Sequence, residues 1–231
     1  MKIAILSDIH GNHVALKAVL KEIRFLEINH LFILGDLVGY YYHPDIVIQD
    51  LKSFAKDMIL GNHEEMLKRL YENENESDKI LEKYGHGIEI AINKLNENSL
   101  KEIMSLDEKK LIIKDNLRFE LCHGSPWDLN LYIYPDSDLE VLKKCASNNI
   151  DFVFMGHTHY QFIFEYNNTL VVNVGSIGQN REKGGIASWA LVNTKNKTLI
   201  FKQTRYNTEQ VIKEAKQYDS NIPFLWEVLI R

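Results

Sequence analysis

The sequence predicts an α/β fold with parallel strands at its centre. In the first half of the 231 residues, short apolar stretches alternate with longer stretches whose apolar residues recur at helical spacing. In the second half, short apolar stretches separated by turn residues predict several antiparallel strands. Neither an internal repeat nor a linker-like stretch interrupts this pattern, so we expect one domain over residues 1–231.

The first half contains three predicted strands, at residues 2–6, 30–34 and 57–60. Residues 14–23 have apolar side chains at helical spacing. Pro44 followed by Asp45 predicts the start of a second helix, which runs to about residue 54. This alternation is typical of parallel sheets, in which ligands bind beyond the carboxyl ends of the strands.

Residues 64–106 have a different pattern, because helical stretches follow one another without strands between them. We expect a helical insertion that lies over the functional site. An acidic, polar run at residues 72–78 predicts an exposed loop within this insertion. The Tyr-Gly-His-Gly sequence at residues 84–87 interrupts the helical pattern, either as a hinge or substrate-facing loop or as an ordinary structural turn.

The second half is rich in predicted strands. They lie at residues 111–113, 118–122, 151–155, 162–165, 170–174, 188–193 and 198–204. Asn167 with Asn168, and Lys195 with Asn196, predict hairpin turns. A final helix at about residues 208–218 precedes a tail with apolar residues at 224–226, which docks either on the body or on a second subunit of a homo-oligomer.

The composition excludes some classes of partner. A net charge of -5 leaves no broad basic surface of the kind that binds extended nucleic acid. No apolar stretch is long enough to cross a membrane, and the first strand ends in an acid rather than in a leader cleavage site. Cys122 and Cys145 have no recognisable pairing and predict two buried thiols, with Cys122 facing away from His123. We therefore expect a cytoplasmic protein.

Residues able to bind a metal follow five of the predicted strands directly. They are Asp8 and His10, Asp36, Asn62 and His63, His123, and His157 and His159. Carboxylate and amide oxygens together with imidazole nitrogens suit divalent ions such as manganese, iron, zinc, nickel and cobalt. Each motif alone is as well explained by a surface turn, but five of them at strand ends predict a metal site.

These five blocks resemble the calcineurin-like metallophosphoesterase superfamily, and its small prokaryotic metallophosphodiesterases in particular. Residues 35–40, 123–126 and 172–179 also resemble one subgroup of that superfamily. The resemblance extends from residue 1 to about residue 204. It implies a four-layer α/β/β/α sandwich of two mixed sheets, with a dinuclear metal centre at the carboxyl ends of the strands.

The resemblance also implies a role for each motif residue. The expected ligands are Asp8, His10, Asp36 and His159 for one divalent ion, and Asp36, Asn62, His123 and His157 for the other. We expect manganese first, although iron, nickel, zinc and cobalt suit the same donors. His63 matches the residue placed near the leaving group, as a proton donor or as a group that stabilises the transition state. Glu64 is either part of the site or simply an acid at the start of a helix.

Two further residues are candidates for substrate binding. Arg181 reaches a substrate phosphate as a forked donor or lies on an exposed loop. Tyr40, in a run of three tyrosines after Asp36, lines a pocket for a planar group or packs beneath the helical insertion.

The function implied is hydrolysis of a phosphate ester by hydroxide generated at the two ions, with a small phosphodiester as the expected substrate. The alternatives are a phosphomonoesterase, a dinucleoside polyphosphate hydrolase, or a non-catalytic binding or scaffold protein on the same fold. The diester preference depends on the resemblance alone.

Overall fold

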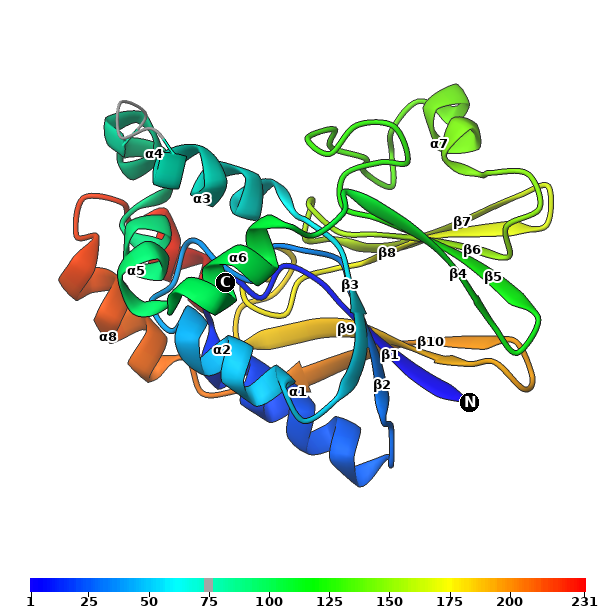
Figure 1. Cartoon of the computed structure of the whole chain (residues 1–231), viewed down its shortest axis with the longest axis horizontal. Coiled ribbons are helices and arrows are strands. Elements are labelled where there is room, and N and C mark those ends of the chain that lie inside the picture. The colour runs from blue at the N-terminus through cyan, green and yellow to red at the C-terminus, as the bar shows by residue number, and fades with distance from the viewer. Residues whose placement is uncertain (73–76) are drawn as a thin grey trace.

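The computed structural model describes residues 1–72 and 77–231. Two five-stranded sheets lie face to face at its centre (Figure 1). Helices cover the outer face of the first sheet, and a short helix covers the outer face of the second. The predicted four-layer α/β/β/α sandwich of two mixed sheets is confirmed.

The first sheet has the strand order β10-β9-β1-β2-β3. Its strands are β1 (Lys2–Leu6), β2 (His30–Ile33), β3 (Ala55–Met58), β9 (Ile186–Asn193) and β10 (Thr198–Arg205). The first three are parallel, whereas β9 is antiparallel to β1 and β10 is antiparallel to β9. The carboxyl ends of β1, β2 and β3 therefore meet at one edge of the sheet.

The third strand begins two residues earlier than the sequence predicts. Residues 57–60 are the most apolar part of this region, but pairing with β2 already starts at Ala55. Polar side chains are tolerated here because β3 is an edge strand. Asp57 in addition accepts a hydrogen bond from Nε2 of His30 on the neighbouring strand, at 2.7 Å.

The second sheet has the order β4-β5-β6-β8-β7. Its strands are β4 (Lys109–Lys114), β5 (Leu117–Cys122), β6 (Phe152–Met155), β7 (Gln161–Tyr166) and β8 (Thr169–Val174). β5, β6 and β8 are parallel, while β4 and β7 pair antiparallel at the two edges. The β7–β8 hairpin turns at Asn167 and Asn168, whose φ angles of 50° and 65° are those of the predicted tight turn.

Apolar side chains from both sheets fill the space between them. Ile3 and Ile5 of β1 and Phe32 of β2 are completely buried against Phe119 and Phe154 of the second sheet. The rings of Phe32 and Phe119 meet edge to face, with centroids 5.5 Å apart. This core holds the two sheets in a fixed relation, and with them the loops that leave their strands.

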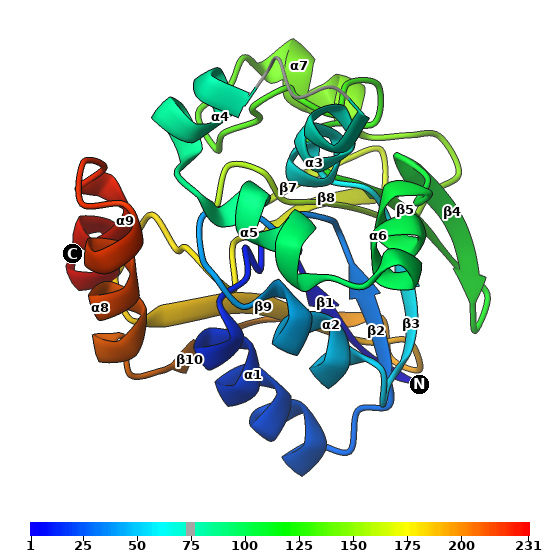
Figure 2. The ribbon, with the colours of Figure 1, turned by 60° about the vertical axis from the view of Figure 1, so that its left-hand side comes forward.

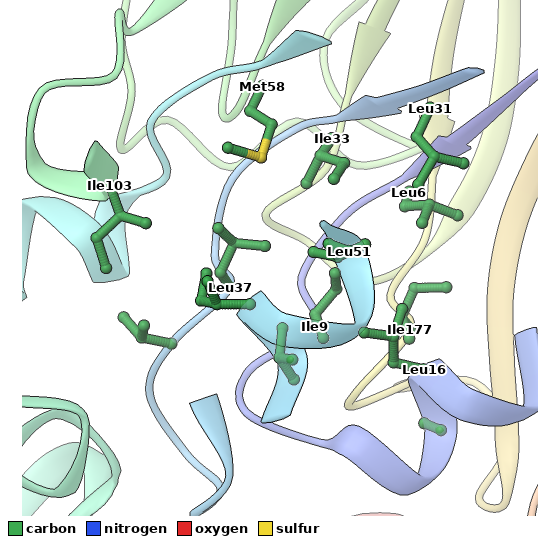
Figure 3. Close-up of a cluster of buried hydrophobic side chains, with 14 of the residues drawn as sticks. Leu6, Ile9, Leu16, Leu31, Ile33, Leu37, Leu51, Met58, Ile103 and Ile177 are labelled. Carbon is green, nitrogen blue, oxygen red and sulfur yellow. The ribbon is translucent and has the colours of Figure 1, made fainter. Parts of the chain in front are cut away.

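Two helices cover the outer face of the first sheet, as the sequence predicts. They are α1 (His13–Phe25) and α2 (Pro44–Leu51). Leu16 of α1 and Leu51 of α2 lie near Leu6, Leu31 and Ile33 of the sheet (Figure 3). The second helix ends three residues before the predicted boundary at residue 54, because the chain turns at Lys52–Ser53 toward β3 (residues 52–54 in Figure 1).

Helix α7 (Leu139–Cys145) covers the outer face of the second sheet and was not predicted, because seven residues are too few to display a helical period. It buries Leu142 and Cys145 against Val153 and Met155. Cys122 belongs to the same cluster and its thiol faces the carbonyl of Phe154. Both thiols are buried, as expected, and Cys122 points away from the strand-end residues.

The described residues between Asn62 and Met104 contain a series of helices. They are α3 (Asn62–Glu72), α4 (Ser77–Tyr84), α5 (Gly87–Lys94) and α6 (Glu97–Met104). Leu67, Ile88 and Ile103 pack into the same apolar cluster as α1 and α2, so these helices extend the outer layer past the end of β3 (Figures 1 and 2). The predicted exposed loop at 72–78 falls mainly on residues 73–76, which lie outside the described residues.

The chain ends in α8 (Glu209–Tyr218), α9 (Phe224–Glu227) and a 3₁₀ helix (Val228–Ile230). Leu225 and Val228 are buried against Tyr41 and Tyr42 of the loop after β2, and the hydroxyl of Tyr41 donates to the carbonyl of Leu225 at 3.1 Å. Of the two alternatives for the tail, the structure shows docking on the body. Among the described residues, no helix has the length and apolar character needed to cross a membrane.

Candidate metal centre

The loops that leave the parallel strands of both sheets meet at one edge of the molecule. Asp8 and His10 follow β1, and Asp36 follows β2. From the second sheet, His123 follows β5, and His157 and His159 follow β6. All of these side chains are at least 96% buried. The two sheets thus bring together residues that lie up to about 150 positions apart in the chain (151 between Asp8 and His159).

The backbone at this edge is unusual for residues other than glycine. Six of the site residues have φ between 52° and 66°: Asp8, His10, Asp36, Tyr40, His157 and His159. This left-handed conformation costs L-residues about 1 kcal/mol or more each and clusters at functional sites. It turns the side chain that follows each strand end inward, toward the junction of the two sheets.

Asp8, His10 and His159 form one group. Nδ1 of His10 donates to the carbonyl of Val38 at 3.1 Å, and Nδ1 of His159 donates to the carbonyl of Gln179 at 2.6 Å. Because a neutral imidazole carries one proton, both Nε2 atoms present lone pairs. These two atoms lie 3.1 Å apart, and Nε2 of His159 is 3.2 Å from Oδ1 of Asp8.

Asp36, Asn62, His123 and His157 form a second group. Nδ1 of His123 donates to the carbonyl of Leu34 at 2.7 Å, and Nε2 of His157 donates to the carbonyl of Asn130 at 3.2 Å. The remaining nitrogens of both rings point at Oδ1 of Asn62, at 2.8 and 2.9 Å. An amide oxygen has no proton to give, so in the neutral form of each ring a nitrogen lone pair faces this oxygen.

The carboxylates dominate the electrostatics of the site. Burial alone would raise the pKa of Asp36, but the neighbouring histidines, His123 first, lower it overall. Burial likewise opposes the shift of Asp8, whose pKa the facing histidines, His159 first, hold well below the usual range. The same charges act in reverse on His123: burial would lower its pKa, but Asp36 and Asp8 raise it to about 10, so without a bound cation Nε2 of His123 keeps a proton that a cation would replace. Both carboxylates are therefore ionised and need positive charge beside them.

The donor set fits divalent cations. Oδ1 of Asp8 is buried without a hydrogen-bond partner in the described part of the chain. Burial lowers the pKa of His157 and of His159 to about 4, so these two rings supply no positive charge near neutral pH. Three overlapping sets have their ligand atoms within 4.8 Å of one another: Asp8 with His10 and His159, His10 with Asp36 and His63, and Asp36 with His123 and His157. Cations among these atoms would satisfy both the lone pairs and the buried carboxylates.

His63 lies beside the two groups rather than between them. Its backbone N–H donates to Oδ1 of Asp36 at 2.8 Å, and its Nε2 is 3.9 Å from Oδ2 of the same carboxylate. Its Nδ1 is buried without a partner among the described residues. Burial lowers the pKa of the ring well below its ordinary value, although Asp36 opposes the shift. The ring packs edge to face on His10, with centroids 4.6 Å apart.

The model of the calcineurin-like phosphoesterase superfamily domain matches residues 1–197, which include every one of these loops. The chain belongs to that superfamily. The resemblance inferred from the five motifs is thus confirmed, and with it the placement of this chain among metallophosphoesterases.

Relatives of this superfamily member come from archaea and bacteria. An uncharacterized protein of Methanocaldococcus jannaschii is 30% identical over 236 residues, which cover 92% of this chain and 89% of that protein. A hypothetical protein of Pyrococcus horikoshii has a TM-score of 0.83 at 20% identity, over 100% and 98% of the two chains. A metallophosphoesterase of Sphaerobacter thermophilus has a TM-score of 0.77 at 22% identity, over 99% and 98%. At these identities, the two solved structures show a shared fold.

Glu64 has a role that the sequence does not reveal. Its carboxylate is completely buried and accepts backbone N–H groups from Asp36 and Leu37, both at 2.7 Å, and from Gly61 at 2.9 Å. Burial, together with the charge of Asp36, raises its pKa to about 7. Glu64 therefore ties the loop after β2 to the start of α3. Acids are common at the start of helices, so the sequence alone does not set Glu64 apart. Its hydrogen bonds to the loop after β2 do.

Gly61 allows this close approach. A Cβ at this position would overlap the carboxylate and the backbone nitrogen of Asp36. Any other residue would push the β2 and β3 loops apart, and with them Asp36 and Asn62.

The two substrate candidates lie at the rim of the site. Tyr40 is 6% exposed, and its ring centroid is 4.6 Å from that of His10 and 4.8 Å from that of His63. Arg181 is half-buried, and its Nε has no hydrogen-bond partner in the described chain. The other two tyrosines of the run, Tyr41 and Tyr42, point away from the site and pack beneath the C-terminal helices.

Two further aromatic residues contact histidines of the site. Tyr84 belongs to the stretch 84–87, for which a substrate-facing loop is one of the predicted alternatives, whereas Tyr132 was not predicted. Tyr84, at the end of α4, lies 5.2 Å from His63 between ring centroids. Tyr132, in the loop between β5 and α7, lies 3.9 Å from His157. Nothing in the sequence near Tyr132 distinguishes it from an ordinary surface residue, because no motif lies beside it.

The His86 turn, by contrast, is structural. Nδ1 of His86 lies 2.6 Å from Oδ1 of Asp219, and its backbone N–H donates to the same carboxylate at 3.1 Å. Of the alternatives for residues 84–87, the contacts of His86 favour a turn that is fastened to the C-terminal helices.

Proposed function

We propose that this chain hydrolyses a phosphate ester at two divalent metal ions held by the strand-end residues, with manganese as the first expectation. The main support for the proposal is that buried carboxylates lie close to several imidazole nitrogens. In each of these rings the other nitrogen donates its proton to a backbone carbonyl. Iron, nickel, zinc and cobalt remain alternatives, because the mixed oxygen and nitrogen donors suit all of them. The superfamily to which the chain belongs supports hydrolysis of phosphate esters as the reaction.

The proposed ligands divide between the two groups. We assign Asp8, His10, Asp36 and His159 to one ion and Asp36, Asn62, His123 and His157 to the other. Support comes from the central position of Asp36, whose Oδ2 lies 3.3 Å from Nε2 of His123 and 3.7 Å from Nε2 of His10. When bound, such a pair of ions supplies Lewis acidity to phosphate oxygens and activates water.

The backbone carbonyls behind the histidines orient these ligands. The carbonyls of Val38, Gln179 and Leu34 each accept an Nδ1 proton, which fixes the tautomer and turns Nε2 toward the centre. The rings therefore need no reorganisation before they coordinate. The free energy stored in the left-handed loops is offset by these bonds and by the ions.

His63 is proposed to act on the leaving group. Its ring is neutral at neutral pH because it is buried, and an anionic phosphate beside it would favour the protonated form. It can then give a proton to the departing alkoxide, or donate a hydrogen bond to it. General acid catalysis of this kind contributes about 10²–10⁴-fold.

The expected substrate is a small phosphodiester. A phosphomonoester and a dinucleoside polyphosphate are the alternatives within the same chemistry, and a non-catalytic binding protein is the alternative outside it. The charge of -5 disfavours an extended nucleic acid. We also propose that residues 64–106 act as an insertion in a single domain, with Tyr84 as its contribution to the site, and that the protein works in the cytoplasm.

The test compares two chromogenic esters. Metal-stripped protein is reloaded separately with manganese, nickel, cobalt, zinc or magnesium, and the initial rates of hydrolysis of bis-p-nitrophenyl phosphate and p-nitrophenyl phosphate are measured. We expect turnover of the diester that is absent without metal. Turnover of the monoester alone would assign a monoesterase, and no turnover by protein that contains two ions would favour a binding protein.

The role of His63 is tested in the same assay. His63→Ala should keep both ions, measured by elemental analysis, and lose about 10²–10⁴-fold in the rate of diester hydrolysis. A variant with full metal content and the wild-type rate would contradict the assignment.

A further inference from the structure

Tyr132 is a large aromatic side chain that lies beside the candidate metal centre (here called the metal edge) and is open to solvent. It is 43% exposed, and its ring centroid lies 3.9 Å from that of His157, with an angle of 35° between the planes. Within the described residues it belongs to none of the four apolar clusters. One side of the ring shields the histidine, and the ring of Tyr134 lies nearly parallel to it, with centroids 6.1 Å apart. The exposed part of the Tyr132 ring is available to a ligand.

The loop that carries Tyr132 is held in place. Two residues earlier, the carbonyl of Asn130 accepts the Nε2 proton of His157 at 3.2 Å, and the amide of Asn130 donates to Glu65 at 3.3 Å. Ser125 accepts the backbone N–H of Asp128 at 2.9 Å in the turn that precedes. A ring anchored in this way loses little conformational entropy when a ligand stacks on it.

Two cations and a second, half-buried ring lie near Tyr132 and the site histidines. The ammonium of Lys83 lies 4.9 Å from the ring centroid of Tyr84, and Tyr84 in turn lies 5.2 Å from His63. Burial raises the pKa of Tyr132, and the charges of Arg181 and Lys83 both oppose that shift. The electrostatic influence of both cations thus extends to Tyr132.

Arg181 lies in the loop between β8 and β9. It follows Gln179, whose carbonyl holds His159, and its charge acts on the pKa of His159 and of Tyr40. Its Nε is buried without a partner in the described chain, so the guanidinium has donor capacity left for a ligand. A forked guanidinium matches the oxygens of a phosphate.

Each feature recognises a different part of one kind of molecule. An exposed ring stacks with planar heterocycles irrespective of their identity. A partly buried arginine and a neighbouring lysine favour an anion beside that ring. A sugar phosphate or an aliphatic ester would use the cations but would leave the face of Tyr132 without a contact.

We propose that the substrates are nucleotide-type phosphate esters, in which a planar base stacks on Tyr132 while Arg181 donates to a phosphate oxygen. This inference rests on the proposed function for the position of the phosphate. Tyr132 thereby determines specificity for the base, and Arg181 binds the phosphate that all such substrates share.

The test measures binding rather than turnover. Manganese-loaded protein is titrated by calorimetry with adenosine 5′-monophosphate, ribose 5-phosphate and inorganic phosphate, which share the phosphate and differ in the base. We expect the adenosine compound to bind about tenfold or more tightly than ribose 5-phosphate, since stacking on an aromatic residue contributes about 5- to 100-fold in affinity. Tyr132→Leu should bring that ratio close to one, whereas Tyr132→Phe should preserve it.

Two further variants separate the contributions. Tyr71→Leu removes a tyrosine of similar exposure, 48%, on α3, and should leave the ratio unchanged. Arg181→Lys keeps the charge but loses the fork, so it should weaken all three ligands alike and leave the ratio intact. Metal content is measured for every variant.

Equal binding of the adenosine compound and ribose 5-phosphate by the wild type would overturn the proposal. So would an unchanged ratio in Tyr132→Leu, because Tyr132 would then only shield His157. The failure of the proposed function gives a different result: the preference for the base persists, but neither chromogenic ester is hydrolysed.

Discussion

Two buried clusters of aspartate and histidine in this protein have opposite hydrogen-bonding states. At the C-terminal helices, the carboxylate of Asp219 accepts the hydroxyl proton of Tyr42 at 2.7 Å as well as the ring and backbone N–H groups of His86. At the metal edge, Oδ1 of Asp8 has no partner in the described chain, and the Nε2 atoms of His10 and His159 face each other.

The difference shows which cluster is structural and which awaits a ligand. A buried carboxylate surrounded by donors stabilises the fold by itself, because every lone pair is satisfied. A buried carboxylate surrounded by acceptors is stable only with added positive charge. Residue types alone do not separate the two clusters, since both consist of aspartate and histidine. The direction in which each histidine proton points separates them.

The largest expected effect comes from removing the carboxylate shared by the two proposed ion sites. Asp36→Ala should lose both metal and activity, with the rate of diester hydrolysis falling by at least about 10³-fold, because the ions supply most of the charge stabilisation. Elemental analysis and the chromogenic assay check this outcome.

The matched control is Asp57→Ala, which breaks another aspartate–histidine pair, with His30, on β3. It should cost about 1 kcal/mol of stability or less and leave metal content and rate intact. Full metal content in Asp36→Ala would refute the assignment of Asp36 as a ligand.

An intermediate effect is expected from Glu64, which positions the ligands without belonging to them. Glu64→Gln replaces one carboxylate oxygen by an NH₂ group that faces the backbone N–H groups of Asp36 and Gly61. Metal affinity should fall by about 10–100-fold, as is usual for groups that orient ligands. Competition with a chelator measures the change.

Glu65→Gln is the control, because the neighbouring carboxylate is partly exposed and accepts only from the side chain of Asn130 among the bonds described. Its metal affinity should equal that of the wild type. If both variants bind metal as tightly as the wild type, Glu64 serves the fold and not the site.

The smallest effect on metal binding is expected from a change in the cluster of Asp219, Tyr42 and His86, whose hydrogen bonds are complete. Asp219→Ala leaves the donors of Tyr42 and His86 without an acceptor, and should lower the free energy of unfolding by about 1–3 kcal/mol. Denaturant titration measures this loss, while elemental analysis should show unchanged metal content. Loss of metal in Asp219→Ala would contradict the separation of the two clusters.

Much of the architecture could be predicted from local pattern. The strands at residues 2–6 and 118–122 and the hairpin at Asn167 and Asn168 follow from short-range rules, because alternation and turn chemistry involve residues close in the chain. The third strand was predicted two residues too late and α7 was not predicted, because the local signal is weak in both places. β3 starts with polar residues on a sheet edge, and α7 is too short to show a period.

The sequence by itself determined which strand-end residues are candidates for the site: a strand is recognisable from a few residues, and the polar residue that follows it is adjacent in the chain. The five motifs and the superfamily therefore follow from the sequence. Only the tertiary structure decided which carbonyl takes each histidine proton, that Glu64 ties two loops together, and that Tyr132 and Tyr84 stand at the rim. These contacts join segments that no local rule relates, since they arise where the edges of two sheets and a helical layer meet.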